Sequence, residues 1–378
     1  MRFVLIFLVA PGLFAQSFDL QGYVAVRGAN TGGSDFRLET EHGDDFDAVA
    51  QLGVEWRPSQ YFDVHVSGVA REDDPGLIEA YADGRLIFGL DEVQLRAGQF
   101  FLPTSRENKD ELWASPYTIN FSALNTWIAE EFRPIGAELS WQHVLQRGHV
   151  LTTAVTAFRG NDSMGALLGW RGWNVGNRLS AYGEVLPLPP LSPFFASQRD
   201  DGTKPFGRDL DGNTGYAARV RYSVPQRGNV QYAWVDNRGD RELHRGEYAW
   251  ATNFHLVSGE IGNPDSFIAA AEAMRGSTGM GFAPAFVQGD FYAAYVLASF
   301  KRNRNRWTAR FDLFGVDEKD FSPGGPNDES GQSWTLAWLF EVTPSLRAGA
   351  EFTQVTGNNF AGWDATGRSV TVELRYGF

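Results

Sequence analysis

The chain ends on the stretch RSVTVELRYGF, residues 368–378, in which apolar and polar residues alternate up to the last position. Successive side chains of a β-strand point to opposite faces, so this alternation predicts a strand with one apolar and one polar face. The apolar face consists of Val370, Val372, Leu374, Tyr376 and Phe378. Because the last residues of a soluble domain are seldom well ordered, such regularity at the terminus indicates a strand that must pair with another strand.

Runs with the same period of two recur along the chain, and most of them are about ten residues long. We expect sixteen strands in these runs, which cover 18–26, 48–56, 62–70, 78–88, 93–97, 135–145, 148–159, 165–173, 176–186, 214–224, 228–238, 290–301, 306–317, 332–342, 346–356 and 369–378. About ten residues is the length that a tilted strand needs to cross a bilayer. The outward positions of the late runs, such as Trp334, Leu336 and Trp338, are too apolar to face water. The pattern therefore predicts strands that lie in lipid.

The connections between these runs alternate between two classes. Short connections are 57–60, 89–92, 145–148, 173–176, 224–228, 302–305 and 342–346, and long polar ones are 30–45, 101–134, 187–213, 239–289, 318–331 and 357–368. Short turns at one end and long loops at the other are typical of outer-membrane barrels. Since lipid cannot satisfy the backbone polar groups of an edge strand, we expect an all-β fold, a closed transmembrane antiparallel β-barrel.

The region 239–289 leaves the strand count open. An alternating run at 244–258 either belongs to a long loop, which gives sixteen strands, or is one of two strands hidden there, which gives eighteen. A single extra strand would give an odd number, which bacterial barrels avoid. We expect sixteen strands. A secreted β-sandwich also has spaced alternating strands, but it needs neither apolar outward faces nor two classes of connection.

Residues 1–15 have the pattern of a secretory signal peptide, with Arg2, an apolar run at 3–10 and Ala15 before the expected cut. After this segment there is no stretch of about 18 consecutive apolar residues, so no transmembrane helix is expected. The chain has no cysteine, which excludes a disulfide framework, and its net charge of −13 disfavours a nucleic-acid partner. We expect residues 16–378 to form the barrel in a bacterial outer membrane, in contact with lipid and lipopolysaccharide.

The stretch VQLRAGQFFLPTSREN (93–108), followed by FRPIGAELSW (132–141), resembles the phosphate-selective porin family of outer-membrane proteins. The matching positions are Gly98, Gln99, Phe100, Pro103, Ser105, Arg106 and Gly136. The resemblance implies a sixteen-stranded porin that assembles as a homotrimer. It does not carry over the family's phosphate-binding row of basic residues, which has no counterpart that we can place in this chain. The terminal segment also resembles the signal of barrels inserted by the barrel-assembly machinery, with Leu374, Tyr376 and Phe378 at its apolar positions.

The segment 101–134 connects the fifth and sixth expected strands and is much longer than an ordinary hairpin loop, so a functional role is expected. In porins the loop at this position folds into the lumen, and the resemblance implies the same here. The segment is also rich in large apolar residues, which an exposed loop would carry at a cost in free energy. A loop that covers the barrel mouth or contacts a neighbouring subunit is the alternative.

Charges on this segment and on the lumen side of nearby strands predict a pore constriction. The predicted constriction residues are Arg71, Arg85, Arg96, Arg106, Glu107, Lys109, Asp110 and Glu111. Charges of both signs around a narrow aqueous zone would sort solutes by charge. Such charges can instead pair as salt bridges of the wall, which we favour for Arg310, Asp312, Arg347, Glu351, Glu373 and Arg375 on later strands.

Signals of catalysis are weak. The six histidines lack His-Glu-x-x-His spacing, and no serine lies in a Gly-x-Ser-x-Gly turn. The stretch DLDGNTG (209–215) has the start of a calcium loop without its distal glutamate, so a turn is expected there. We predict no catalytic residue, metal ligand or cofactor, and a porin that passes small hydrophilic or charged solutes by diffusion. The alternatives are a plugged barrel for adhesion or anchoring and an outer-membrane hydrolase.

Overall fold

The computed structural model describes residues 17–33, 43–71, 75–189, 191, 193–195, 197–198, 202–320, 328–358 and 364–378. The expected signal peptide at 1–15 lies outside the described residues. In the part of the chain that the structure describes, no helix has the length and hydropathy of a membrane span.

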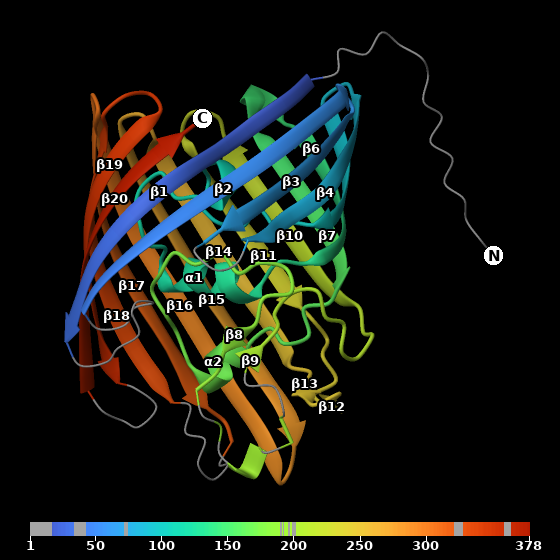
Figure 1. Ribbon diagram of the computed structural model, residues 1–378. Helices are drawn as coiled ribbons and strands as arrows, with labels where there is room; N and C mark the ends of the chain where they lie inside the picture. The colour runs from blue at the N-terminus through green and yellow to red at the C-terminus, as the bar shows by residue number, and fades with distance from the viewer. Residues whose placement is uncertain are drawn as a thin grey trace.

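Sixteen antiparallel strands close into one barrel, as predicted (Figure 1). In order around the barrel they are β1 (Ser17–Gly33), β2 (Gly43–Ser59), β3 (Phe62–Ala70), β4 (Pro75–Phe88), β5 (Asp91–Gln99), β6 (Ile135–Val144), β7 (Val150–Arg159), β10 (Gly215–Val224), β11 (Gly228–Asp236), β14 (Ala251–Asn263), β15 (Phe267–Phe282), β16 (Ala285–Arg302), β17 (Asn305–Glu318), β18 (Glu329–Glu341), β19 (Leu346–Asn358) and β20 (Asp364–Gly377). Each strand pairs with its neighbour in chain order, so the topology is up-and-down throughout.

The last strand closes the barrel against the first. β20 pairs with β1 from Tyr23 opposite Gly377 to Gly33 opposite Gly367. The sequence predicts a partner segment around 18–28, and the observed pairing is shifted about five residues further along β1. The shift has a physical reason: strands that tilt to close a barrel must be staggered. Phe378 exchanges two backbone hydrogen bonds of 3.0 Å with Gly22, where a Cβ would lie 2.7 Å from the Phe378 ring.

The two faces of the strands differ as the alternation predicts. On β20, Leu374 and Phe378 are 51% and 52% exposed on the outer face, whereas Glu373 is 4% exposed on the lumen side. An outer face of exposed large apolar residues continues around the barrel on nearly every strand. In water such a surface would be unfavourable, and in a bilayer it is matched by lipid.

The two ends of the barrel are unequal. At one end the strands are joined by short turns at 60–61, 89–90, 145–149, 225–227, 264–266, 303–304 and 342–345, and the C-terminus lies at this end (Figure 1). At the other end lie the longest connections, 100–134, 160–214 and 237–250. These contain η1 (Glu111–Trp113), α1 (Ala123–Glu131), α2 (Ala166–Trp170), β8 (Leu186–Pro187), η3 (Pro193–Phe195), β9 (Gly202–Thr203), β12 (Leu243–His244) and β13 (Glu247–Tyr248), and η2 (Gln146–Gly148) lies in a short turn.

Two of the predicted strands are wrong. Residues 165–173 and 176–186 form no barrel strand. They contain α2, irregular chain and the first residue of the two-residue strand β8, and the predicted short turn at 173–176 lies within one long connection. The residues of α2 are buried on every side, from Ala166 to Trp170. Alternation of small and large residues in this stretch reflects packing against several elements rather than the two faces of a strand.

The region 239–289 is not one loop, because residues 251–282 within it supply the two missing strands. Here β14 and β15 pair with each other and with the neighbouring β11 and β16. The predicted number of sixteen is therefore confirmed, although two omitted strands replace two wrong ones. On β14 the lumen side carries the buried Phe254 and Leu256, so both faces of this strand are apolar and the expected alternation is weak.

Candidate functional site

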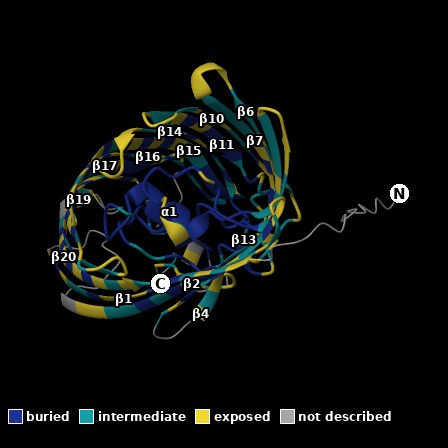
Figure 2. Ribbon diagram, turned by 90° about the horizontal axis from the view of Figure 1, so that it is seen from above, coloured by how far each residue is buried: buried dark blue, intermediate teal, exposed yellow. Residues whose placement is uncertain are grey.

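The segment 101–134 folds into the barrel, as predicted. Seen along the barrel axis, α1 lies in the interior (Figure 2), and every residue of the helix is buried. The helix begins after Ser122, whose hydroxyl accepts a hydrogen bond of 3.2 Å from the backbone N–H of Asn125. This N-cap satisfies one of the helix's free N–H groups in a place that bulk water does not reach.

Apolar side chains hold α1 against one side of the lumen. The Trp127 ring packs 5.5 Å from the rings of both Phe254 on β14 and Phe291 on β16, and 6.1 Å from that of Trp173. These residues belong to one buried apolar cluster inside the barrel. The lumen face of β14–β17 is therefore apolar at this height because it packs against protein rather than water.

A second connection also enters the interior, which the sequence did not predict. Glu131 on α1 accepts hydrogen bonds from the Trp127 indole N–H at 2.7 Å, from the Gly165 N–H at 3.1 Å and from the Leu167 N–H at 2.9 Å. One carboxylate thus ties α1 to the start of α2. Close approach elsewhere on α2 depends on Gly169, where a Cβ would lie 2.4 Å from the Trp250 ring. The tryptophans of the stretch GWRGWN (169–174) are the sequence signal that could have indicated this packing.

A buried arginine anchors the segment 101–134 to the barrel wall. Arg310 on β17 forms ion pairs with Glu107 of the segment at 2.5 Å and with Asp312 of its own strand at 3.0 Å. The same guanidinium donates hydrogen bonds to the backbone carbonyls of Asn120 at 2.8 Å and Phe121 at 2.9 Å. The side chains of Arg310 and Glu107 are fully buried. We call the contacts of Arg310 the Arg310 anchor.

Two glutamates of the wall bind the same segment through its backbone. Glu351 on β19 accepts hydrogen bonds from the N–H groups of Ile119 at 2.6 Å and Asn120 at 3.0 Å. Glu272 on β15 accepts one from the Arg106 N–H at 2.6 Å. Together with Arg310 on β17, these contacts from β15 and β19 mean that three strands of one wall fix the course of the segment.

The predicted constriction residues divide into two groups. Arg106 and Glu107 are 4% and 0% exposed, and their side chains bind the wall. Glu107 in particular faces no open lumen, and we assign it to the Arg310 anchor instead of the constriction. Lys109, Asp110 and Glu111 follow directly and are exposed. Lys109 also pairs with Glu260.

The predicted arginines of the early strands lie at different heights of the opposite wall. Arg85 pairs with Asp63, and Arg96 pairs with Asp83 at 2.9 Å. Arg71, near the long-loop end, donates a hydrogen bond of 2.7 Å to the Leu179 carbonyl of the second inward connection. The structure therefore brings no single ring of the predicted residues together.

Three arginines surround Glu373 near the β1–β20 seam, and two of them, Arg347 and Arg375, are expected from the sequence to form wall salt bridges. Glu373 pairs with Arg27 at 2.9 Å, with Arg347 at 3.1 Å and with Arg375 at 3.0 Å. Arg27 also donates a hydrogen bond of 2.9 Å to the side chain of Asn177. The Arg27–Asn177 hydrogen bond links the wall to the second inward connection. The group of three arginines around Glu373 carries an excess of positive charge.

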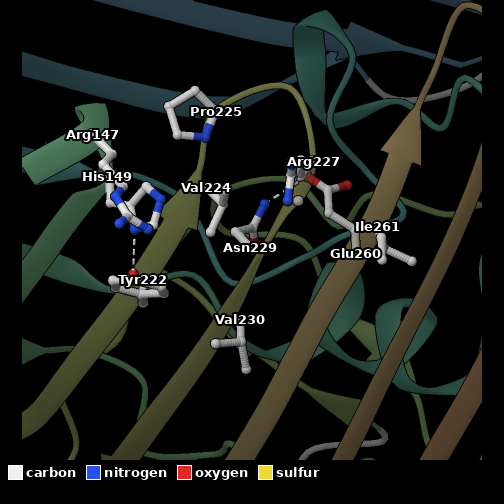
Figure 3. Close-up of a pocket in the computed structure, with 11 residues that line it drawn as sticks. Arg147, His149, Tyr222, Val224, Pro225, Arg227, Asn229, Val230, Glu260 and Ile261 are labelled. Carbon is white, nitrogen blue, oxygen red and sulfur yellow. Dashed lines mark hydrogen bonds between the residues drawn. The ribbon is translucent and has the colours of Figure 1, made fainter.

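A cavity of about 610 Å³ lies at the short-turn rim (Figure 3). Its lining includes Arg147 and Arg227 from two turns, and the His149 ring contacts the Tyr222 hydroxyl at 2.5 Å. Asn229 donates to Glu260 at 2.7 Å within the same cavity. Aromatic and basic residues at a rim are typical of a membrane interface.

Acidic residues gather at the opposite end. Carboxylate oxygens of Asp162, Asp209 and Asp211 lie within 4.8 Å of one another, and burial, with a smaller contribution from the two neighbouring carboxylates, raises the pKa of Asp162 to about 6. Asp209 accepts a hydrogen bond from the Gly212 N–H and Asp211 accepts one from the Asn213 N–H, both at 2.7 Å. These are the contacts of a turn stabilised by aspartates, as the sequence predicts for DLDGNTG.

No protein-family model and no curated protein sequence matches the chain. Solved structures do. The outer membrane channel DcaP of Acinetobacter baumannii is 12% identical with a TM-score of 0.59, over 96% of this chain and 97% of that one. An anion-selective porin from Comamonas acidovorans is 12% identical with a TM-score of 0.53, over 96% and 100%. OmpT in trimer form, an outer membrane protein of Vibrio cholerae, is 9% identical with a TM-score of 0.54, over 96% and 100%.

At these identities the likeness concerns the fold. By its fold the chain is a sixteen-stranded barrel of the outer-membrane porin type. The narrower resemblance to phosphate-selective porins stays a prediction from the sequence.

Proposed function

We propose that this protein is an outer-membrane channel through which small hydrophilic or charged solutes diffuse passively. The observation that carries this proposal is the one-sided attachment of the inward segments. Segment 101–134 is bound to β15, β17 and β19 by buried ionisable side chains, whereas several charged lumen side chains of the opposite wall, among them Arg85, Arg96 and Arg375, keep part of their surface exposed. A low-dielectric wall facing a charged wall is the arrangement that focuses an electric field across a pore.

The proposed solute route follows the charged wall. From the long-loop end it passes Asp47 and Arg71, then the contact of Arg27 with Asn177, and reaches Asp110 at the short-turn end. The tightest point would be the Arg27–Asn177 hydrogen bond. Of the residues predicted for the constriction, we retain Arg71, Arg85, Arg96, Lys109, Asp110 and Glu111, and we assign Arg106 and Glu107 to attachment of the segment.

A plugged barrel is the second candidate, and one observation favours it. The interior holds a large buried apolar cluster that includes Trp127, Trp173 and Phe291, of the kind found in the core of a soluble domain. A barrel filled in this way and used for adhesion or anchoring would not conduct ions.

Single-channel recording in planar lipid bilayers separates the two candidates. A channel gives stepwise conductance with the unmodified protein, and a plugged barrel gives none. The reversal potential in a salt gradient then gives the charge preference. Arg96→Ala should move this potential toward cation preference, because it removes a positive charge from the route; an unchanged potential would contradict the place of Arg96 on it.

The cellular setting is part of the proposal. An outer face of apolar side chains supports a place in the bacterial outer membrane, with lipid and lipopolysaccharide around the barrel and the barrel-assembly machinery as the inserting partner. A homotrimer is supported by the trimeric form of the Vibrio cholerae protein of similar fold. Small outward residues on the short strands, Ala97, Ala137 and Ala157, would let barrels approach closely. Chemical cross-linking in native membranes tests this assembly.

A further inference from the structure

A second cavity, of about 430 Å³, lies where segment 101–134 meets the wall at the short-turn end. Its lining consists of Lys109, Asp110, Pro116, Tyr117, Pro264, Asp265, Lys301, Arg304, Arg306, Leu339, Glu341 and Arg347. Five of these residues are basic and three are acidic. Its volume falls within the range of cavities that hold small organic ligands. We call it the Tyr117 cavity.

The hydroxyl of Tyr117 is the least expected feature of this cavity. Tyr117 is 0% exposed, and its hydroxyl oxygen makes no hydrogen bond within the part of the chain that the structure describes. The ring itself is fixed, since it packs in an apolar cluster with Ile268, Tyr295 and Leu297. A buried hydroxyl without a partner costs about 1–3 kcal/mol, so such a group at a cavity wall indicates a ligand that completes its hydrogen bonding.

Two cations lie close to this ring. The Lys109 ammonium is 5.6 Å and the Arg306 guanidinium 5.2 Å from the ring centroid. Lys109 already pairs with Glu260. Arg306 is bound only through neutral groups, to the Ser299 hydroxyl at 3.1 Å and the Pro264 carbonyl at 2.9 Å, so among the described residues its charge has no carboxylate within salt-bridge distance.

The acids of the cavity are placed differently from these donors. Asp110 and Asp265 are exposed, where water can solvate them, and Glu341 pairs with Lys301 at 2.7 Å. The cavity therefore offers a buried hydroxyl donor and a partly buried guanidinium, whereas its three acids belong to exposed residues. A guanidinium and a hydroxyl together suit an oxyanion.

We propose that the Tyr117 cavity binds a small organic carboxylate, with the carboxylate between the Tyr117 hydroxyl and Arg306 and the apolar body against Pro116, Pro264 and Leu339. The inference deepens the proposed function, since it names a solute class and a binding site at the short-turn end of the route. The apolar lining beside the donors favours a carboxylate over inorganic phosphate, because phosphate has no apolar group that could pack against it.

Binding to the full-length protein in detergent tests the proposal without requiring conductance. Saturation-transfer NMR titrations would use three probes: benzoate, benzylamine with the same ring and the opposite charge, and inorganic phosphate. We expect benzoate to bind at least tenfold more tightly than either of the others. Equal binding of phosphate would overturn the role of the apolar lining, and tighter binding of benzylamine, or no binding of benzoate, would overturn the site.

Variants locate the bound carboxylate. Tyr117→Phe keeps the packed ring and removes only the hydroxyl, and it should weaken benzoate about tenfold, as expected for one lost hydrogen bond. Arg306→Gln should weaken it at least as much. Arg302→Gln is the matched control. It also removes one positive charge, but Arg302 is exposed and does not line the cavity. Equal affinities in all three variants would refute the site, and channel conductance without benzoate binding would refute it while leaving the proposed function intact.

Discussion

The Arg310 anchor is the contact whose loss should change the pore most. Arg310→Ala leaves the carboxylates of Glu107 and Asp312 buried without their cation, and it removes a donor from the carbonyls of Asn120 and Phe121. Removing one partner of a buried ion pair costs about 3–5 kcal/mol. Each lost hydrogen bond to a carbonyl adds about 1 kcal/mol.

The barrel itself should survive this substitution. Its sixteen strands are closed by backbone ladders that do not involve the Arg310 side chain. The cost therefore falls on the docking of segment 101–134, and about 5–7 kcal/mol shifts the docking equilibrium by more than roughly a thousandfold. We expect the segment to leave the wall while the barrel stays folded.

Single-channel recording measures the width of the pore in this variant, and limited proteolysis measures whether segment 101–134 has left the wall. The Arg310→Ala protein should show larger and noisier conductance steps, and protease should cut within 101–134, while the folded barrel still migrates differently from the heated protein in electrophoresis. Adding Glu107→Gln should restore part of the docking, because it removes one of the uncompensated charges. Arg302→Ala on the outer face serves as control. Unchanged conductance together with a protected segment would refute the assignment of Arg310 as an anchor.

Three further outcomes follow from the structure. The pKa of Asp162 is raised to about 6, so the folded state holds this proton more tightly than the unfolded state; the stabilisation is complete below pH 3.8 and is lost as pH rises through about 6, on the order of 3 kcal/mol. Thermal unfolding of Asp162→Asn should lack this component, and an unchanged pH profile relative to the native protein would contradict it. Trp127→Ala empties the centre of the interior cluster and should cost about 3–5 kcal/mol, seen as a lower temperature of segment release; equal melting would contradict the packing role. Phe378→Ala should slow insertion by the assembly machinery severalfold in a pulse-chase experiment, whereas Val370→Ala on the same face should not; equal rates would refute the assembly signal.

The barrel could be predicted from the sequence because its outer face meets a uniform solvent. Lipid requires an apolar residue at every second position, and the final stretch 368–378 displays that period without interruption. The lumen imposes no such uniform rule. Where protein fills the lumen, as at Phe254 and Leu256 on β14, the inward positions are apolar too and the contrast between the two faces is weak. From the sequence, the alternating run at 244–258 is therefore expected in a loop although it covers most of β14, and two strands in this region are only the alternative that gives a count of eighteen.

The candidate site could be predicted only in part, for a different reason. The length and apolar content of 101–134 indicate that the segment must pack on something, and the structure places it in the lumen. Which charges face the pore depends on partners far away in sequence: Glu107 is an anchor only because Arg310 lies opposite. The inward path of the second connection likewise depends on contacts of Glu131 and Trp250 that local periodicity does not encode.

The contacts that hold segment 101–134 also constrain the order of folding. Arg106, Glu107 and Ile119 are bonded to residues 166, 203 and 232 positions later in the chain. Loop-closure entropy opposes contacts at such separations. Docking requires Glu272 on β15, Arg310 on β17 and Glu351 on β19 to be in place, because these side chains bind the segment. We therefore expect segment 101–134 to dock no earlier than these three strands form, although it precedes all of them in the chain.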